Sequence, residues 1–131
     1  MKSYSDTINE LSRKQAAETD EQRHARTGLS SNDLTDQQSR AVQKTPYRVT
    51  IESIRAKMVS CDYYNPPSAK HMTMAIVLLD NGYIIVGKST PADPANFNEE
   101  LGRKFALEDA ERQIWPLEAY LMRETLTILN E

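Results

Sequence analysis

Six residues in the second half of the chain could together hold a small phosphorylated ligand: Lys88, Asn96, Phe97, Asn98, Arg103 and Arg112. An aromatic ring such as Phe97 can stack on a base, and the amides that flank it can read the edge of that base. Arg103 follows a predicted helix start, where backbone amides favour an anion. Lys88 and Arg112 are further candidates for the phosphate contact. The structural alternatives are that Phe97 plugs the helix entrance and that Arg103 forms an ion pair.

The residue patterns that carry catalysis or bind a metal are absent from the sequence. His24 and His71 have no HExxH or paired-cysteine context, so we expect no metal site. Cys61 is the single cysteine and cannot form an internal disulfide. Cys61 and His71 could meet across strands, but without a third partner they make a poor catalytic dyad. We therefore expect a protein that binds without catalysis and without a cofactor.

Alternating apolar residues predict where the sheet begins. The segment 47–59 predicts a first strand, with a β-bulge near Glu52–Ser53 because the apolar pattern changes phase there. A loop is predicted for 61–68, since consecutive prolines cannot donate hydrogen bonds to a strand ladder.

A hairpin is predicted to follow this loop. Residues 71–79 are apolar on both faces, which predicts a central strand covered on each side. Asn81 and Gly82 then separate this strand from another at 83–86. Asn-Gly between two apolar runs is a strong hairpin signal and favours a type I′ turn.

Two C-terminal helices are predicted after the sheet. The first begins at Asp93–Pro94 or at Asn96, which offer competing N-caps, and runs to about Gln113. Its predicted buried face consists of Leu101, Gly102, Phe105, Ala106, Ala110 and Ile114. Charged residues gather on the opposite side, namely Glu100, Lys104, Glu108 and Glu111.

Pro116 predicts a kink or a break before the second helix. Residues 117–129 then carry apolar side chains on two faces. The terminal helix of a small domain has no need of two apolar faces, so we expect a second protomer to cover one of them.

The first 44 residues differ in composition from the rest. They hold seven basic and seven acidic residues and few large apolar ones, which predicts a polar arm that is partly helical or disordered. Thr7 with Glu10 and Thr35 with Gln38 match capping boxes, and residues 28–32 form a break between them. The predicted domain covers 45–131, and the arm could become ordered on a partner.

Composition limits the function classes further. The chain has 131 residues, 39% of them hydrophobic and 27% charged, and a net charge of −3. This balance fits one small domain with a tail and argues against a general nucleic-acid binder. No segment has the length and apolarity of a membrane span, and the first residues lack the apolar core of a signal peptide. We expect a cytosolic protein.

From the hairpin onward the sequence resembles a family of small bacteriophage proteins, found in short-tailed phages and prophages. The residues that carry the resemblance are Asn81, Gly82, Gly87, Pro94, Asn96, Phe97, Glu100, Gly102, Arg103, Ala106, Ala110, Ile114, Trp115, Leu117, Glu118 and Tyr120. The resemblance covers about the last sixty residues closely and the first strand loosely. It implies a small antiparallel sheet with two helices, assembled as a homo-oligomer.

One branch of that family resembles the Thoeris anti-defence sponges, which sequester a cyclised ADP-ribose signal made by TIR-domain enzymes. Some of these proteins also hold cyclic oligonucleotides at separate sites. The resemblance thus implies a protein of the host cytoplasm that captures a small nucleotide-type ligand. The alternatives are a protein that binds a host or phage protein through its arm and helices, and an enzyme that acts on such a nucleotide.

Overall fold

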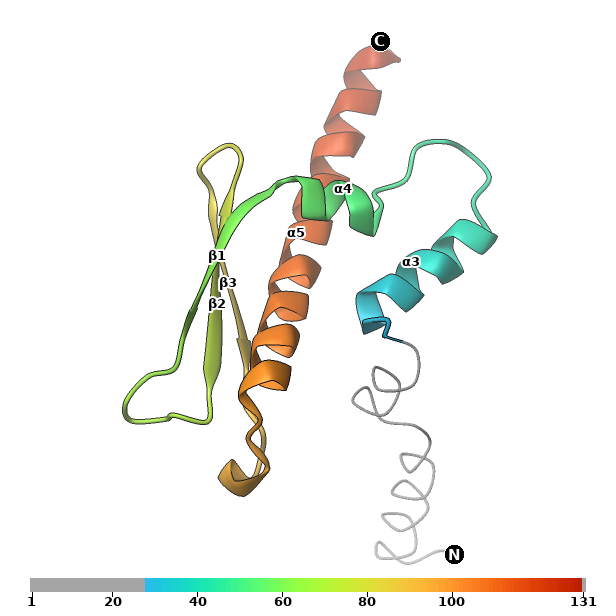
Figure 1. The fold of residues 1–131 in the computed structure, drawn as a ribbon. Helices are drawn as coiled ribbons and strands as arrows, with labels where there is room; N and C mark the ends of the chain where they lie inside the picture. The colour runs from blue at the N-terminus through green and yellow to red at the C-terminus, as the bar shows by residue number, and fades with distance from the viewer. Residues whose placement is uncertain (1–27, 131) are drawn as a thin grey trace, which may run out of the picture. The chain divides into compact units, whose positions relative to one another are not determined.

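The computed structural model describes residues 28–130 and has an α+β fold (Figure 1). The chain divides into two units between Ser31 and Asn32, and the sheet belongs to the second. The elements in chain order are α3 (Ser31–Ala41), α4 (Ile51–Ala56), β1 (Met58–Tyr64), β2 (Thr73–Leu79), β3 (Ile84–Ser89), the 3-10 helix η1 (Pro94–Asn96) and α5 (Glu99–Leu129). The strands form an antiparallel sheet in the order β1-β2-β3. The predicted class and the antiparallel sheet are confirmed.

A short helix, α4, occupies the middle of the predicted first strand 47–59. Thr50 and Ser53 form a capping box, in which each side chain accepts a hydrogen bond from the other residue's backbone amide, at 3.0 and 3.1 Å. This local pairing starts α4 and overrides the apolar alternation. The predicted bulge near Glu52–Ser53 is therefore wrong, and the ladder irregularity lies between Met58 and Ser60.

Strand β1 extends further than the proline-based prediction allowed. Cys61 through Tyr64 belong to β1, and the loop begins only at Asn65. The Asn65 amide closes this loop by donating hydrogen bonds to the Met72 carbonyl at 2.7 Å and to the Thr73 hydroxyl at 3.0 Å. Prolines 66 and 67 therefore interrupt the ladder only after β1 has ended.

Strand β2 is central, as predicted, but only one of its faces is fully buried. Ala75 and Val77 point toward α5 and are completely buried, whereas Leu78 on the other face is exposed. Ile76 and Leu78 lie beside Val86 and Ile84 of β3 in the ladder, and the latter two are exposed as well. The predicted covering on both sides is wrong within residues 28–130.

The Asn-Gly hairpin is confirmed, but its turn is not type I′. Only Gly82 has a positive φ, at 88°, and Asn81 does not. Gly82 donates its amide to the Leu79 carbonyl at 2.9 Å, and Leu79 donates to the Tyr83 carbonyl at 2.9 Å. The hairpin loop therefore consists of the three residues 80–82 and ends on a glycine in the left-handed conformation. Loops of this kind are the next most common hairpin connection after two-residue turns.

The predicted Asp93–Pro94 cap is confirmed, but it starts the 3-10 helix η1 and not the long helix, and the alternative cap at Asn96 is wrong. Asp93 caps η1 by accepting a hydrogen bond from the Ala95 amide, whereas Asn98 caps α5 through the Leu101 amide at 2.9 Å. The helix then continues through Pro116 to Leu129. The two predicted C-terminal helices are thus one helix, and the predicted break is wrong.

Small residues let α5 lie directly against the sheet. A Cβ atom on Gly87 of β3 would stand 2.1 Å from the Ala106 carbonyl oxygen and 2.6 Å from the Ala110 amide nitrogen. A Cβ atom on Gly102 would stand 2.7 Å from the Thr73 hydroxyl of β2. The predicted buried stripe through Gly102, Ala106, Ala110 and Ile114 is confirmed, and it is the sheet that covers it.

The other side of α5 is also covered, which the sequence did not predict. Glu108 and Glu111, expected on the solvated side, are 5% and 2% exposed. Asn32 of α3 donates from its amide to the Glu108 carbonyl and to the Glu111 carboxylate, at 3.0 and 3.1 Å. Arg55 of α4 donates to the Glu111 carboxylate at 2.7 Å and to Asp33 at 2.8 Å.

Helix α3 is therefore fastened to the domain by charged groups. Asp36, which is 2% exposed, accepts hydrogen bonds from Arg48 at 2.7 Å and from the Ile51 amide at 3.1 Å. The sequence assigned this helix to the arm 1–44, with a start near Thr35. The helix begins at Ser31 instead. All of its residues from Asn32 onward belong to the same unit as the sheet. The other predicted arm helix, at Thr7 to Glu10, lies outside the described residues.

Candidate functional site

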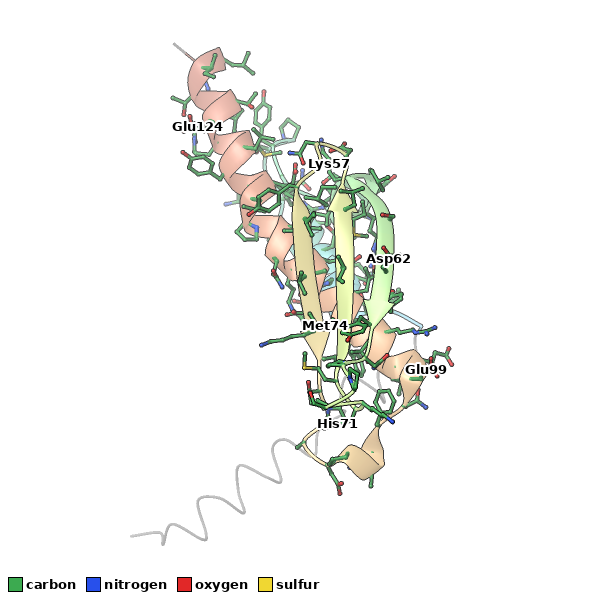
Figure 2. The ribbon with its side chains drawn as sticks, turned by 90° about the vertical axis from the view of Figure 1, so that its left-hand side faces the viewer. Lys57, Asp62, His71, Met74, Glu99 and Glu124 are labelled. Carbon is green, nitrogen blue, oxygen red and sulfur yellow. The ribbon has the colours of Figure 1, made fainter. Side chains whose placement is uncertain are left out.

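A shallow depression of about 520 Å³ lies between β1 and the first turns of α5. Its lining consists of Tyr63, Glu99, Glu100, Arg103 and Lys104. Tyr63 comes from the inward-facing row of β1, opposite Ala75 in the ladder, and the charged residues come from α5. In Figure 2, Glu99 lies near the end of the sheet at which Met74 of β2 and the turn residue His71 are labelled.

The centre of the depression is a cation on an aromatic face. The Arg103 guanidinium lies 5.5 Å from the centroid of the Tyr63 ring, within the range of about 6 Å for a cation–π interaction. Arg103 also donates a hydrogen bond to the Glu99 carboxylate at 2.9 Å. About half of the Arg103 side chain is exposed, and Glu99 is more exposed still. Solvent therefore reaches the guanidinium, the carboxylate and the ring.

The Tyr63 hydroxyl stays protonated near neutral pH. Burial raises its pKa to about 12, helped by its hydrogen bond with the Cys61 thiol and partly offset by Arg103. Burial also raises the pKa of Cys61, so the thiol is not activated as a nucleophile. Tyr63 can therefore offer its ring to a ligand, but it cannot act as a base near pH 7.

Both cations of the depression are already paired with carboxylates. Arg103 faces Glu99, and the Lys104 ammonium lies 3.8 Å from the Glu108 carboxylate. The ion pair that the sequence analysis gave as the structural alternative for Arg103 is therefore present. Glu100 adds another carboxylate, so an anionic ligand would have to take Arg103 from Glu99.

The predicted residues at the helix entrance serve local structure. Phe97 is half-buried, and its ring edge would touch a Cβ placed on Gly102 at 3.3 Å. This contact matches the plug rather than an open stacking platform. Asn98 uses its side-chain oxygen to cap α5, and the backbone of Asn96 hydrogen-bonds to Asp93. Asn96 and Asn98 are both exposed.

The three predicted cations are not brought together in one chain. Arg103 and Arg112 are nine residues apart on α5, which places them on opposite sides of the helix, about 13 Å apart along its axis. Lys88 lies beside Met74 in the ladder, on the sheet face that points away from α5. Of the six predicted residues, only Arg103 lines the depression.

Sequence reasoning gave Tyr63 a minor role because it placed that residue in a loop. The signal for its true position was present, since Cys61 and Tyr63 continue a strand alternation up to Pro66. Glu100 and Lys104, which also line the depression, were interpreted as members of the charged helix face opposite the buried one. No local sequence pattern indicates that the first turns of this helix lie next to β1.

Two apolar depressions lie at the other end of α5. They have volumes of about 280 and 350 Å³ and share the lining residues Tyr47, Arg48, Val49, Met122 and Leu126. Around them Leu117, Tyr120, Leu121, Ile128 and Leu129 are exposed. The lining of these two depressions is mainly apolar, whereas four of the five residues that line the depression at Tyr63 are charged.

Neither a metal site nor a membrane-spanning helix is found in the described part of the chain. No group of three histidine, cysteine, aspartate or glutamate residues within 28–130 has an arrangement that could hold a metal ion. None of the helices there is both long enough and apolar enough to cross a bilayer.

The fold thus defines a small α+β domain in which one long helix covers one face of a three-stranded sheet. Residues 49–126, more than half of the chain, match the model of the phage protein family that is described by N4 Gp49 and phage Sf6 gene 66. The chain belongs to this family of phage proteins. No curated protein and no solved structure matches it.

Proposed function

We propose that this phage protein is a non-catalytic binding protein that sequesters a small nucleotide-type signal of host defence in the host cytoplasm. The ligand class is cyclised ADP-ribose or a cyclic oligonucleotide, as in the Thoeris sponges that the sequence resembles. The protein acts as a homo-oligomer. Sequestration requires affinity and no chemistry, in keeping with the protonated Tyr63 hydroxyl and the unactivated Cys61 thiol.

The observation that carries the proposal is the stacked pair of Arg103 and Tyr63 in an open depression. A guanidinium offers fork-shaped donors to a phosphate and a flat face to a base. The Tyr63 ring offers a second aromatic surface. The depression therefore combines the two kinds of contact that recognise a nucleotide.

The existing ion pair does not prevent ligand binding. Arg103 and Glu99 are both well exposed, and exposed ion pairs contribute about 0–1 kcal/mol. Exchanging the Glu99 carboxylate for a singly charged phosphodiester or for one phosphate of a pyrophosphate therefore costs little, and two phosphate oxygens can accept parallel hydrogen bonds from the guanidinium.

Calorimetric titration with cyclised ADP-ribose isomers and with cyclic di- and trinucleotides tests the proposal. We expect one of these ligands to bind to the wild-type protein. Arg103→Ala and Tyr63→Ala should each weaken this binding by about tenfold or more, because one charge-assisted hydrogen bond or one stacked ring contributes at least about 1.4 kcal/mol.

Arg112→Ala is the matched control. It removes the same side chain from the opposite side of α5, where it is also exposed, and should leave the affinity unchanged. Phe97→Ala separates the two interpretations of that residue, since a plug affects stability and a platform affects affinity. Absence of binding to every ligand in the panel would contradict the proposal, as would equal losses in Arg103→Ala and Arg112→Ala.

A second candidate function is binding to a host or phage protein. It is favoured by the exposed apolar residues of the C-terminal half of α5, because contiguous apolar surface on a small domain marks an interaction site. Capture of such a partner that is lost on Leu121→Glu and retained in Arg103→Ala would favour this function.

A further inference from the structure

The apolar stripe by which α5 packs on the sheet continues beyond the end of the sheet. Ile114 is completely buried, and the next residues on the same side of the helix are Leu117, Leu121, Glu124 and Ile128. Their separations of three, four, three and four residues keep them in line along one side of a helix. Leu117, Leu121 and Ile128 are 44%, 55% and 66% exposed.

Both views place this part of α5 outside the area that the sheet covers. In Figure 1 the C-terminal turns of α5 extend past the hairpin of β2 and β3. In Figure 2, Glu124 lies beyond Lys57, which stands at that end of the sheet. We call residues 117–128 on this side of the helix the free stripe.

We propose that the free stripes of two copies pack against each other in an antiparallel homodimer. The two-fold axis then passes between Leu121 and Glu124, so that Leu117 lies opposite Ile128 of the partner copy and Leu121 lies opposite Glu124. This pairing covers the free stripe from its first residue to its last. The pairing gives the homo-oligomer of the proposed function a specific contact surface, and this inference rests on that proposed function. The ligand takes no part in the contact.

The sheet itself determines the direction of the pairing. The stripe of each helix is already occupied by its own sheet up to Ile114. A parallel partner helix would bring its own sheet to the level of the first sheet, on the same side, where the two would overlap. An antiparallel partner helix places the two sheets at opposite ends of the helix pair.

The charges favour the same arrangement. Glu124 is the one charged residue in the free stripe, and a parallel pair in register would place two Glu124 carboxylates side by side in the seam. In the antiparallel pair each Glu124 faces Leu121 instead. The flanking positions that meet lie on the same edge of each stripe, Tyr120 with Thr127 and Glu118 with Thr125, so no two like charges face each other.

The contact is small for a dimer. Twelve helical residues extend over about 18 Å, and one helix crossing of this length buries less than the roughly 800 Å² per partner of a standard interface. The dimer should therefore dissociate on dilution, which makes its strength measurable.

The test is the mass of the ligand-free protein, measured by sedimentation or light scattering over a dilution series. The wild-type mass should rise with concentration from one chain toward two. Leu121→Glu should weaken association at least about tenfold, because it places a second carboxylate in the seam. Glu124→Leu should strengthen association by about tenfold, since it completes the apolar seam.

Leu129→Glu is the matched control, since it makes the same change at an exposed leucine of the same helix that lies off the stripe. It should leave the mass curve unchanged. The proposal is overturned if the wild-type protein and Glu124→Leu both remain single chains, or if Leu129→Glu acts as strongly as Leu121→Glu. Neither result depends on nucleotide binding, so the ligand proposal can fail or hold separately.

Orientation is tested with single cysteines in a Cys61→Ser background. An equal mixture of Leu117→Cys and Ile128→Cys chains should form mixed disulfide dimers on oxidation. Dimers formed only within each variant would indicate a parallel pair and overturn the antiparallel arrangement.

Discussion

Replacing Gly87 with alanine is expected to destabilise the domain by about 3 kcal/mol, the upper part of the range for overpacked cores. The added Cβ would stand 2.1 Å from the Ala106 carbonyl oxygen and 2.6 Å from the Ala110 amide nitrogen. Both atoms belong to the backbone of α5, so no side-chain rotation relieves the overlap. The helix would have to move away from β3, and contacts along the buried stripe would be lost. The midpoint of urea unfolding measures this loss.

Gly82→Ala is the matched control for this substitution. Nothing lies within 4 Å of a Cβ at Gly82, and its only obstacle is the positive φ of 88°. A left-handed alanine costs about 1–2 kcal/mol, so this variant should be the less damaged of the two. A Gly87→Ala protein that unfolds at the wild-type urea concentration would contradict the close packing of α5 on the sheet.

Replacing Asp36 with alanine is expected to cost about 3 kcal/mol or more. Its buried carboxylate accepts hydrogen bonds from Arg48 and from the first amide of α4, Ile51. Without it the Arg48 guanidinium, whose side chain is 15% exposed, loses its carboxylate partner and retains hydrogen bonds to the Gln43 side chain and to the carbonyl of residue 36; removing one partner of a buried ion pair costs about 3–5 kcal/mol. Arg40→Ala removes a cation that contacts the same carboxylate but is 66% exposed, and it should cost no more than about 1 kcal/mol.

The contribution of Asp36 should also depend on pH. Burial by itself would raise the pKa of this carboxyl, but hydrogen bonds from Arg48 and Ile51 outweigh it and lower the pKa below 3.8. A lowered pKa in the folded state means that the stabilisation is complete above the ordinary value and is lost as the pH falls through the folded value. The stability difference between wild type and Asp36→Asn should therefore shrink below about pH 4. A difference that grows on acidification would show that Asp36 is not held as a carboxylate.

Local signals account for the parts of the fold that the sequence predicted. The Asn81-Gly82 hairpin depends on neighbouring residues, and the stripe through Gly102, Ala106 and Ala110 depends on helical spacing. Helix α4 was missed because the change of apolar phase between Ile51 and Ile54 was interpreted as a β-bulge, while the decisive signal was the capping box of Thr50 and Ser53. Pro116 was expected to interrupt α5, but burial of Ile114 and packing of Trp115 and Met122 against the core hold the helix together on both sides of it.

Contacts between distant segments account for what the sequence could not supply. Glu111 is buried because Asn32 and Arg55, 79 and 56 residues away, provide its hydrogen bonds. Hydrogen bonds to Glu111 and Asp33 raise the pKa of Arg55 even though burial by itself would lower it. In the same way, Arg103 was recognised as a candidate from its place after a helix start, but its stacking partner Tyr63 lies forty residues earlier on β1. Periodicity within one element cannot indicate such a pair.

The central claim is that the protein holds a nucleotide-type signal without changing it. The most direct measurement is to incubate the protein with the best-bound ligand of the titration panel, remove free ligand, unfold the protein by heat and identify what is released. The account predicts that the released molecule is chemically identical to the one added, in an amount that rises in proportion to the protein and falls in Arg103→Ala. Release of a hydrolysed or otherwise altered molecule, or retention of none, would contradict it.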